Sequence, residues 1–225
     1  MSVNQQAYFH LQKELSEKGV TLIAVSKTKP VSDINELYKL GHRDFGENYV
    51  QELTDKVQQL PADIRWHFIG HLQRNKVKFI LPFVHLIHSV DSLRLLLEIE
   101  KQASKIGHQI SVLLQIYIAG EETKFGLDEA ELSELADYLQ KNPLRHVQIK
   151  GMMGMASFTE DKVVVEKEFT YLRSLFDKYS AVNIPGTAFE KLSMGMSGDY
   201  SLAVQHGSNM VRIGSILFGA RQLNR

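Results

Sequence analysis

The sequence predicts a (β/α)8 barrel of the TIM type with an extra N-terminal helix, in a single domain over residues 1–225. Short apolar segments alternate with amphipathic segments along the whole chain, which indicates parallel strands joined by helices. The alternation gives eight strands and eight helices, counting the leading helix, at roughly 25 residues a unit, close to the minimum for such a barrel. No linker, low-complexity tract or block of charge interrupts it.

The first half of the chain is expected to hold the leading helix and four strand–helix units. Apolar residues spaced four apart predict the leading helix over residues 4–18, and Gly19 ends it. The later strands are short apolar or alternating runs, and Gly or Pro ends several helices. The expected strands are 22–26, 42–46, 64–69 and 83–88, and the helices are 30–40, 47–60, one from 73, and one capped by Asp91 or Ser92 that runs to 106.

The second half continues the same alternation with longer strands and helices. Residues 110–118 are rich in β-branched and apolar side chains, as a buried strand is, and Asn142-Pro143 ends the helix that follows. The other expected strands are 147–155, 191–196 and 210–218, and the helices are 128–139, 162–179 and 199–206.

Charge and composition narrow the possible functions. The chain has 26 Lys and Arg residues and 26 Asp and Glu residues, so its formal net charge is zero. A charge of zero does not favour a nucleic-acid or membrane partner. The absence of cysteine excludes disulfides, thiolate metal sites and cysteine nucleophiles. No apolar run is long enough to span a bilayer, and the N-terminus does not resemble a signal peptide, so we expect a cytoplasmic location.

Lys27 lies where strand 22–26 meets the helix that begins at Pro30, and ligands bind at such corners in α/β barrels. An amine held against an apolar strand is partly desolvated, which lowers its pKa and leaves some of it nucleophilic, as a Schiff base requires. A solvated lysine is the commoner alternative. Lys29 has the same strand parity, so the residues alone do not choose between the two lysines.

Residues 193–199, at the end of the seventh expected strand, and residues 212–215, on the eighth, resemble a phosphate cradle. Ser197, Gly214 and Ser215 offer hydroxyl and backbone donors where barrels often bind phosphate. The alternative is that the Met-Gly-Met segment only packs tightly and Ser197 only caps the helix near Asp199. Arg212 lies on an apolar strand and needs a carboxylate or a ligand, of which a structural salt bridge is the commoner answer.

Other motifs do not lead to a site. His67 and His71 lie four apart, but the intervening strand pattern and Gly70 argue against a helix that presents both to zinc, so no metal is expected. Residues 195–199 nearly match a hydrolase elbow, but Asp199 stands where its second glycine belongs. No Walker loop is present, and the methionines at 152–155 are expected to fill the core.

Six segments together resemble the pyridoxal phosphate homeostasis proteins, single-domain relatives of the alanine racemase N-terminal barrel. Each segment alone is a weak signal, but together they run from the first strand to the last and are highly specific. The segments are residues 24–30, 45–52, 66–76, 88–92, 192–197 and 211–214.

The resemblance implies a cofactor, the vitamin B6 derivative pyridoxal 5′-phosphate. It implies that Lys27, rather than Lys29, forms the internal aldimine. Ser197, Gly214 and Ser215 then match the phosphate-binding positions. An arginine in the place of Arg212 faces the pyridine nitrogen and keeps it unprotonated, which makes the cofactor a poorer electron sink.

Asn48 is implied to line the cofactor pocket, and one position departs from the family. The fifth strand usually carries an asparagine near its C-terminal end, where this chain has Tyr117, a bulkier residue at the expected pocket mouth. Residues 124–126, which begin with Lys124, still resemble the family's loop after that strand.

The resemblance implies a role in intracellular pyridoxal phosphate homeostasis and delivery, without substantial catalysis, with apo enzymes that use the cofactor as recipients. The alternative is a pyridoxal-phosphate-dependent amino-acid racemase. Racemases that resemble this barrel use a second, β-rich domain for dimerisation and for a tyrosine base, and this chain ends soon after its last strand, so we expect a carrier and a monomer. Racemisation also needs a base on each face of the α-carbon, and only Tyr117 or His71 is conceivable as the second. A third possibility is a phosphate-binding barrel enzyme that does not use pyridoxal phosphate.

Overall fold

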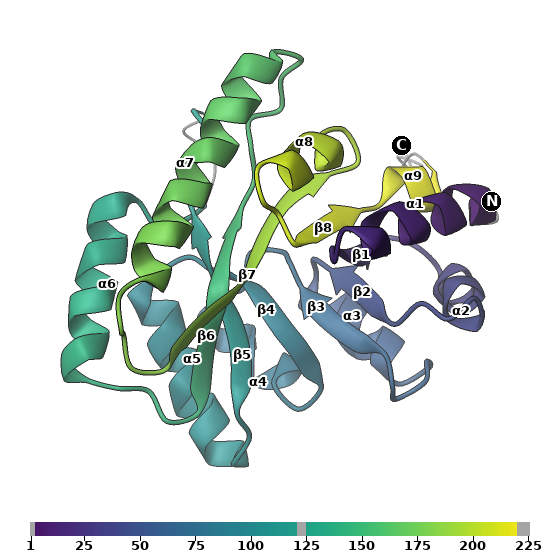
Figure 1. Ribbon diagram of the computed structural model, residues 1–225. Coiled ribbons are helices and arrows are strands. Elements are labelled where there is room, and N and C mark those ends of the chain that lie inside the picture. The colour runs from purple at the N-terminus through teal and green to yellow at the C-terminus, as the bar shows by residue number, and fades with distance from the viewer. Residues whose placement is uncertain (1–2, 121–124, 220–225) are drawn as a thin grey trace.

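The computed structural model describes residues 3–120 and 125–219, and within them eight parallel strands form a closed barrel surrounded by helices (Figure 1). Each strand pairs with its neighbour in the sequence, and the last strand pairs with the first. The predicted (β/α)8 barrel with its leading helix is therefore confirmed. The strands are β1 (Thr21–Val25), β2 (Asp44–Glu47), β3 (Arg65–Phe68), β4 (Val84–Val90), β5 (Ile110–Ile116), β6 (Val147–Gly154), β7 (Thr187–Met196) and β8 (Met210–Ile213).

The helices begin and end close to the positions that the sequence signals predict. Ser92 caps one of them with its side chain, and Asp128 and Glu131 form a capping box at another. The helices are α1 (Gln5–Glu17), α2 (Val31–Lys39), α3 (Val50–Val57), a 3₁₀ turn η1 (Arg74–Lys76) that leads into α4 (Val77–Ile80), α5 (Leu93–Ile106), α6 (Glu129–Lys141), α7 (Lys162–Ser180), α8 (Tyr200–Gln205) and α9 (Ser215–Phe218).

The predicted strand over residues 210–218 is wrong in its second half. β8 ends at Ile213, and Gly214 turns the backbone into α9, where its carbonyl accepts the N–H groups of Leu217 and Phe218 at 3.0 and 2.9 Å. Periodicity did not reveal the break, because apolar residues are buried on both sides of it, Val211 and Ile213 before and Leu217 and Phe218 after. The break brings Gly214 and Ser215 to a corner at the mouth of the barrel.

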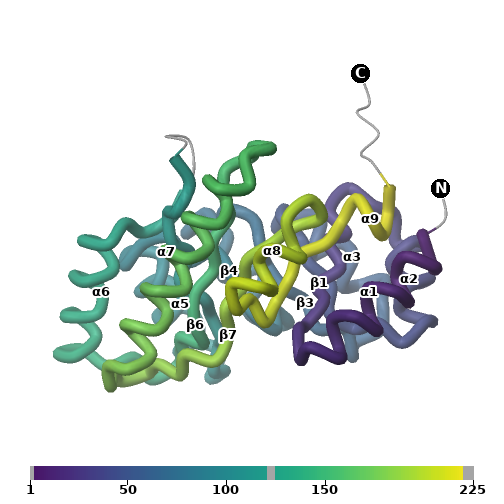
Figure 2. The backbone as a smooth tube through the Cα atoms, turned by 45° about the horizontal axis from the view of Figure 1, so that its top comes forward, coloured from purple at the N-terminus to yellow at the C-terminus, as the bar shows by residue number. Residues whose placement is uncertain are grey.

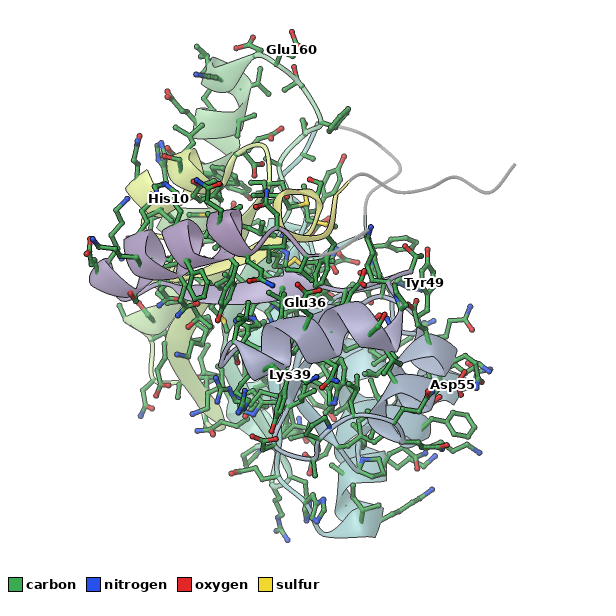
Figure 3. All side chains as sticks on the ribbon, turned by 90° about the vertical axis from the view of Figure 1, so that its right-hand side faces the viewer. His10, Glu36, Lys39, Tyr49, Asp55 and Glu160 are labelled. Atoms are coloured by element: carbon green, nitrogen blue, oxygen red, sulfur yellow. The ribbon has the colours of Figure 1, made fainter. Side chains whose placement is uncertain are left out.

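The leading helix α1 is held beside α9 and α2 rather than capping the barrel (Figures 1 and 2). The backbone N–H of Asn4 donates to the carbonyl of Leu217 at 2.8 Å. Glu36 lies between α1 and α2, where it accepts a hydrogen bond of 2.7 Å from the amide of Gln5 (Figure 3). The two ends of the described chain therefore meet on one side of the molecule.

The barrel interior is divided between apolar and polar side chains. One group of buried side chains forms a small apolar cluster, and the strand faces that point outward pack against the helices in a larger one. A second interior group is polar and buried. The apolar cluster comprises Ile23, Leu86, Leu113, Met153 and Met210, and the polar group comprises Asp44, His67, His88, Ser193 and Arg212.

In the part of the chain that the structure describes, none of the helices has the length and apolar character needed to cross a membrane. The same residues contain no group of three His, Asp or Glu side chains arranged to hold a metal ion. His67 and His71 do not face each other across a metal site, because His67 contacts His88 and Asp44 while His71 contacts Asp91.

Replacement of Gly195 by alanine should destabilise the fold, because α8 packs directly on β7 at this residue. Gly195 has φ +95°, and a Cβ there would lie 2.5 Å from the Cβ of Ala203. We expect Gly195→Ala to lower the free energy of unfolding in urea by about 2 kcal/mol or more. The matched control is Gly198→Ala three residues later, where a Cβ meets nothing within 4 Å. Equal losses in the two variants would contradict this account.

Candidate functional site

A cavity of about 470 Å³ opens at the C-terminal ends of the barrel strands, and all six residues that the sequence analysis selected line it. Arg212 lies on β8 itself, and the other five come from the turns after β1 and β2 and the loops after β7 and β8. Barrels of this kind place their sites at this end. The six residues are Lys27, Asn48, Ser197, Arg212, Gly214 and Ser215.

The structure separates the two lysines that the sequence pattern left equivalent. Lys29 Nζ donates to the carbonyls of Phe218 and Gly219, at 2.8 and 3.4 Å. These carbonyls end α9, so Lys29 ties that helix to the corner after β1. Lys27 lines the same cavity from within the turn. Lys29 therefore has a structural role, which favours Lys27 as the reactive amine.

A buried lysine on α3 holds the residue before Lys27. The Lys56 side chain is 6% exposed, and its Nζ donates to the carbonyl of Ser26 at 2.8 Å and to Glu47 Oε1 at 2.7 Å. The Ser26 hydroxyl donates to the same Glu47 oxygen at 2.6 Å. Burial raises the pKa of Glu47, and the charge and hydrogen bond of Lys56 oppose that rise. The backbone before Lys27 is thus fixed by an ion pair inside the protein.

The same lysine also fixes the residue after Lys27. Lys56 Nζ donates to Glu52 Oε1 at 2.6 Å, and that oxygen accepts the backbone N–H of Thr28, also at 2.6 Å. Thr28 has φ +63°, a left-handed conformation that is unfavourable for a β-branched residue. The carboxylate at this N–H compensates for the strain. Sequence reasoning missed Lys56, because its spacing of four from Glu52 is typical of a solvated helix pair.

The loops after β7 and β8 meet at the predicted phosphate cradle. Ser197 Oγ accepts the backbone N–H of Gly214 at 3.3 Å. A Cβ on Gly214 would lie 3.2 Å from the carbonyl of Val25, so a side chain there would press on β1. Asp199 accepts the backbone N–H of Met196 and begins α8, so it is Asp199 rather than the Ser197 hydroxyl that closes this turn. Ser197 and Ser215 both line the cavity.

Arg212 is buried without a salt bridge, so the expected structural ion pair is wrong. It is 4% exposed, and no carboxylate of the described residues lies within the 4.0 Å of an ion pair. Its Nη1 donates to the carbonyl and hydroxyl of Ser193 at 2.8 and 2.7 Å, and its Nη2 donates to the carbonyl of Gly154 at 3.0 Å. Burial lowers the pKa of Arg212 to about 10, which leaves it charged at neutral pH.

Asn48 supplies an unused hydrogen-bond acceptor. Its Oδ1 is buried and has no hydrogen-bond partner among the described residues. The loop after β3 packs closely on the Asn48 backbone. A Cβ on Gly70 would lie only 2.2 Å from the Asn48 carbonyl oxygen. Buried polar atoms in native proteins normally have a partner, so the orphan favours a ligand group at this place.

The two residues considered as a second base do not line the cavity. His71 Nδ1 lies 3.0 Å from Asp91 Oδ2, and its ring stacks on Phe125 with 4.1 Å between centroids. Tyr117 follows β5 and lies beside Phe125 and Met155, outside the lining. Lys124, which begins the loop that resembles the family, falls outside the described residues.

Comparisons with known proteins agree with the resemblance. The family described as alanine racemase, N-terminal domain, matches residues 6–222. The pyridoxal phosphate homeostasis protein of Pasteurella multocida is 38% identical over 217 residues, which cover 95% of this chain and 92% of that protein. That of Aquifex aeolicus is 40% identical over 207 residues, which cover 92% and 89%.

A solved structure of PipY from Synechococcus elongatus with pyridoxal phosphate bound has a TM-score of 0.85 and 35% identity to this chain. The match covers 95% of this chain and 99% of that one. The similar fold and the sequence identities point to the same family. The chain therefore belongs to the alanine racemase N-terminal domain family and, within it, to the pyridoxal phosphate homeostasis proteins.

Proposed function

We propose that this protein binds pyridoxal 5′-phosphate through Lys27 and takes part in its homeostasis and delivery, without substantial catalysis. The observation that carries the proposal is that an amine, a buried guanidinium and the loops after β7 and β8 line one cavity. The names of the relatives support it, as does the structure of PipY with this cofactor. The buried Arg212 also fits a polar ligand that accepts a hydrogen bond, and the orphaned Asn48 oxygen fits a ligand group that donates one.

Each residue would hold one part of the cofactor. The Lys27 amine would hold the cofactor covalently through the carbon of its aldehyde group. Ser197, Gly214 and Ser215 would contact the phosphate, and Arg212 would donate to the ring nitrogen. When bound, the cofactor supplies an electron sink. The sink is weak if its ring nitrogen accepts a hydrogen bond and is not protonated.

The lining of the cavity favours a carrier over a racemase. Racemisation needs a second base within hydrogen-bond reach of the α-carbon. Among the described lining residues, the ionisable side chains are Lys27, Lys29, Asp199 and Arg212. Lys29 is bound to the end of α9, and Asp199 holds the turn before α8. Recipient apo enzymes, a monomeric state and a cytoplasmic location stay predictions.

Replacement of Lys27 by alanine should abolish covalent attachment of the cofactor. Purified protein loaded with pyridoxal phosphate should show the visible absorbance of a lysine-bound cofactor, and Lys27→Ala should lose it. Lys29→Ala is the matched control and should keep it, because Lys29 serves α9. Reduction with borohydride followed by peptide mass spectrometry locates the modified lysine. A label on Lys29 in the unchanged protein would overturn the assignment.

Amino acids should not exchange their α-proton in this site. We expect no deuterium at the α-carbon of L-alanine or L-serine after incubation with the loaded protein in heavy water. The same samples analysed for chirality should show no D-isomer. Exchange that disappears in Lys27→Ala would mean that Lys27 acts as a base, and would replace the carrier with the racemase.

Lys56→Met should destabilise the protein and loosen the cofactor, because it leaves Glu47 buried without its cation. We expect the free energy of unfolding to fall by about 3 kcal/mol and the visible band to be lost faster during dialysis. Adding Glu47→Gln should recover much of the stability. The matched control is Lys178→Met, whose partner Glu129 is exposed and whose loss should lower the free energy of unfolding far less.

The loss of free energy of unfolding in Lys56→Met should also depend on pH. Burial raises the pKa of Glu47 in the folded state, and loss of Lys56 removes the charge that opposes the rise. The folded variant then binds a proton more tightly than the unfolded chain, so its stability falls as pH rises through the folded-state pKa. Urea unfolding at several pH values should show a smaller difference from the unchanged protein at acidic pH than at neutral pH. A constant difference would contradict this role of Glu47.

A further inference from the structure

A continuous chain of hydrogen bonds runs through the barrel interior from the start of β2 to Arg212. Asp44 Oδ1 lies 3.1 Å from His67 Nε2, and His67 Nδ1 lies 3.0 Å from His88 Nε2. His88 Nδ1 lies 3.0 Å from the Ser193 hydroxyl, which accepts from Arg212 Nη1 at 2.7 Å. The four contacts join β2, β3, β4, β7 and β8.

The interior of this chain is dry. His88 and Ser193 are 0% exposed and His67 is 1% exposed. Buried polar groups are costly unless they are satisfied, and a cluster of Ile, Leu and Met side chains fills another part of the barrel interior. An unbroken polar chain in such a place indicates a role that apolar packing does not serve.

The chemistry of its two ends gives the chain one direction. A guanidinium has only donors, and a carboxylate has only acceptors. Burial would raise the pKa of Asp44, but hydrogen bonds from Arg65 and His67 outweigh it and hold that pKa well below its usual range. Asp44 therefore accepts from His67 Nε2–H.

The members between the ends must follow the same direction. Burial lowers the pKa of His67 and of His88, so both imidazoles are neutral at neutral pH, with one donor and one acceptor each. His67 Nδ1 then accepts from His88 Nε2–H, and His88 Nδ1 accepts from the Ser193 hydroxyl. With its proton committed to His88, Ser193 presents only lone pairs to Arg212.

We propose that Asp44, His67, His88 and Ser193 are positioning residues that hold the Arg212 guanidinium in place at the ring-nitrogen end of bound pyridoxal phosphate. The inference rests on the function proposed above and deepens it. No carboxylate of residues 3–120 and 125–219 forms an ion pair with Arg212, and its hydrogen bonds go to the Ser193 and Gly154 carbonyls and to this hydroxyl. The carboxylate at the far end of this hydrogen-bond chain is Asp44, at the start of β2.

The first test uses the full chain without cofactor. Ring nitrogens of ¹⁵N-labelled histidine, assigned through couplings to the backbone, report which nitrogen carries the proton. We expect both His67 and His88 to be neutral near pH 7 with the proton on Nε2. An Nδ1–H tautomer or an imidazolium at either residue would overturn the proposal, whatever the protein binds.

The second test follows the ring nitrogen of ¹⁵N-labelled pyridoxal phosphate in the loaded protein. Ser193→Ala and Asp44→Asn should both shift its resonance and release the cofactor roughly tenfold faster, as expected for a weakened hydrogen bond to a charged group. The matched controls are Asp63→Asn, the same change at an exposed aspartate, and Met153→Leu in the apolar cluster. Neither control should move the resonance.

The outcomes separate the two proposals. An unchanged resonance in folded, loaded Asp44→Asn and Ser193→Ala would overturn the positioning role. If Ser193→Ala does not fold, the tautomers and Asp44→Asn decide the question. Failure of the unchanged protein to take up the cofactor would instead overturn the proposed function, and a histidine chain in the expected tautomers would then position Arg212 for another ligand.

Discussion

A positive charge buried inside the barrel is the constraint on which the site depends. Removal of a guanidinium from water costs several kcal/mol unless hydrogen bonds replace its hydration. Arg212 obtains these bonds from β6 and β7, through the Gly154 and Ser193 carbonyls, while it belongs to β8 itself. Closure of the barrel is therefore what makes the charge tolerable, and a site with this arginine needs the complete circle of strands.

The opposite side of the cavity depends on a second buried cation. Lys56 does not reach the cavity, yet its contacts fix the backbone on both sides of Lys27. Lys27 thus stands on a turn whose backbone is hydrogen-bonded on both sides of it. On both sides of the cavity, a residue that lines it is held by groups that do not line it.

Local sequence signals were sufficient for the fold and for part of the cavity lining, whereas Asn48 and the choice of Lys27 over Lys29 came from the family resemblance. The alternation of strands and helices, the corner at Lys27 and the small residues around Ser197 and Gly214 are all short-range patterns. The supporting residues were missed for a physical reason, since Lys56 resembles a solvated helix residue and His67 meets His88 only after the barrel closes. The false strand over 214–218 arose because buried helix and buried strand look alike over four residues.

The directional chain through the barrel has a consequence for how such sequences can diverge. Reversal of any one member sets two donors or two acceptors against each other in a dry interior, so the loss of one member removes the reason to keep the others. Asp44, His67, His88 and Ser193 should therefore be inherited as a set. Relatives that keep the arginine are expected either to retain all four residues or to have apolar side chains at all four positions. Few should have a mixture of the two.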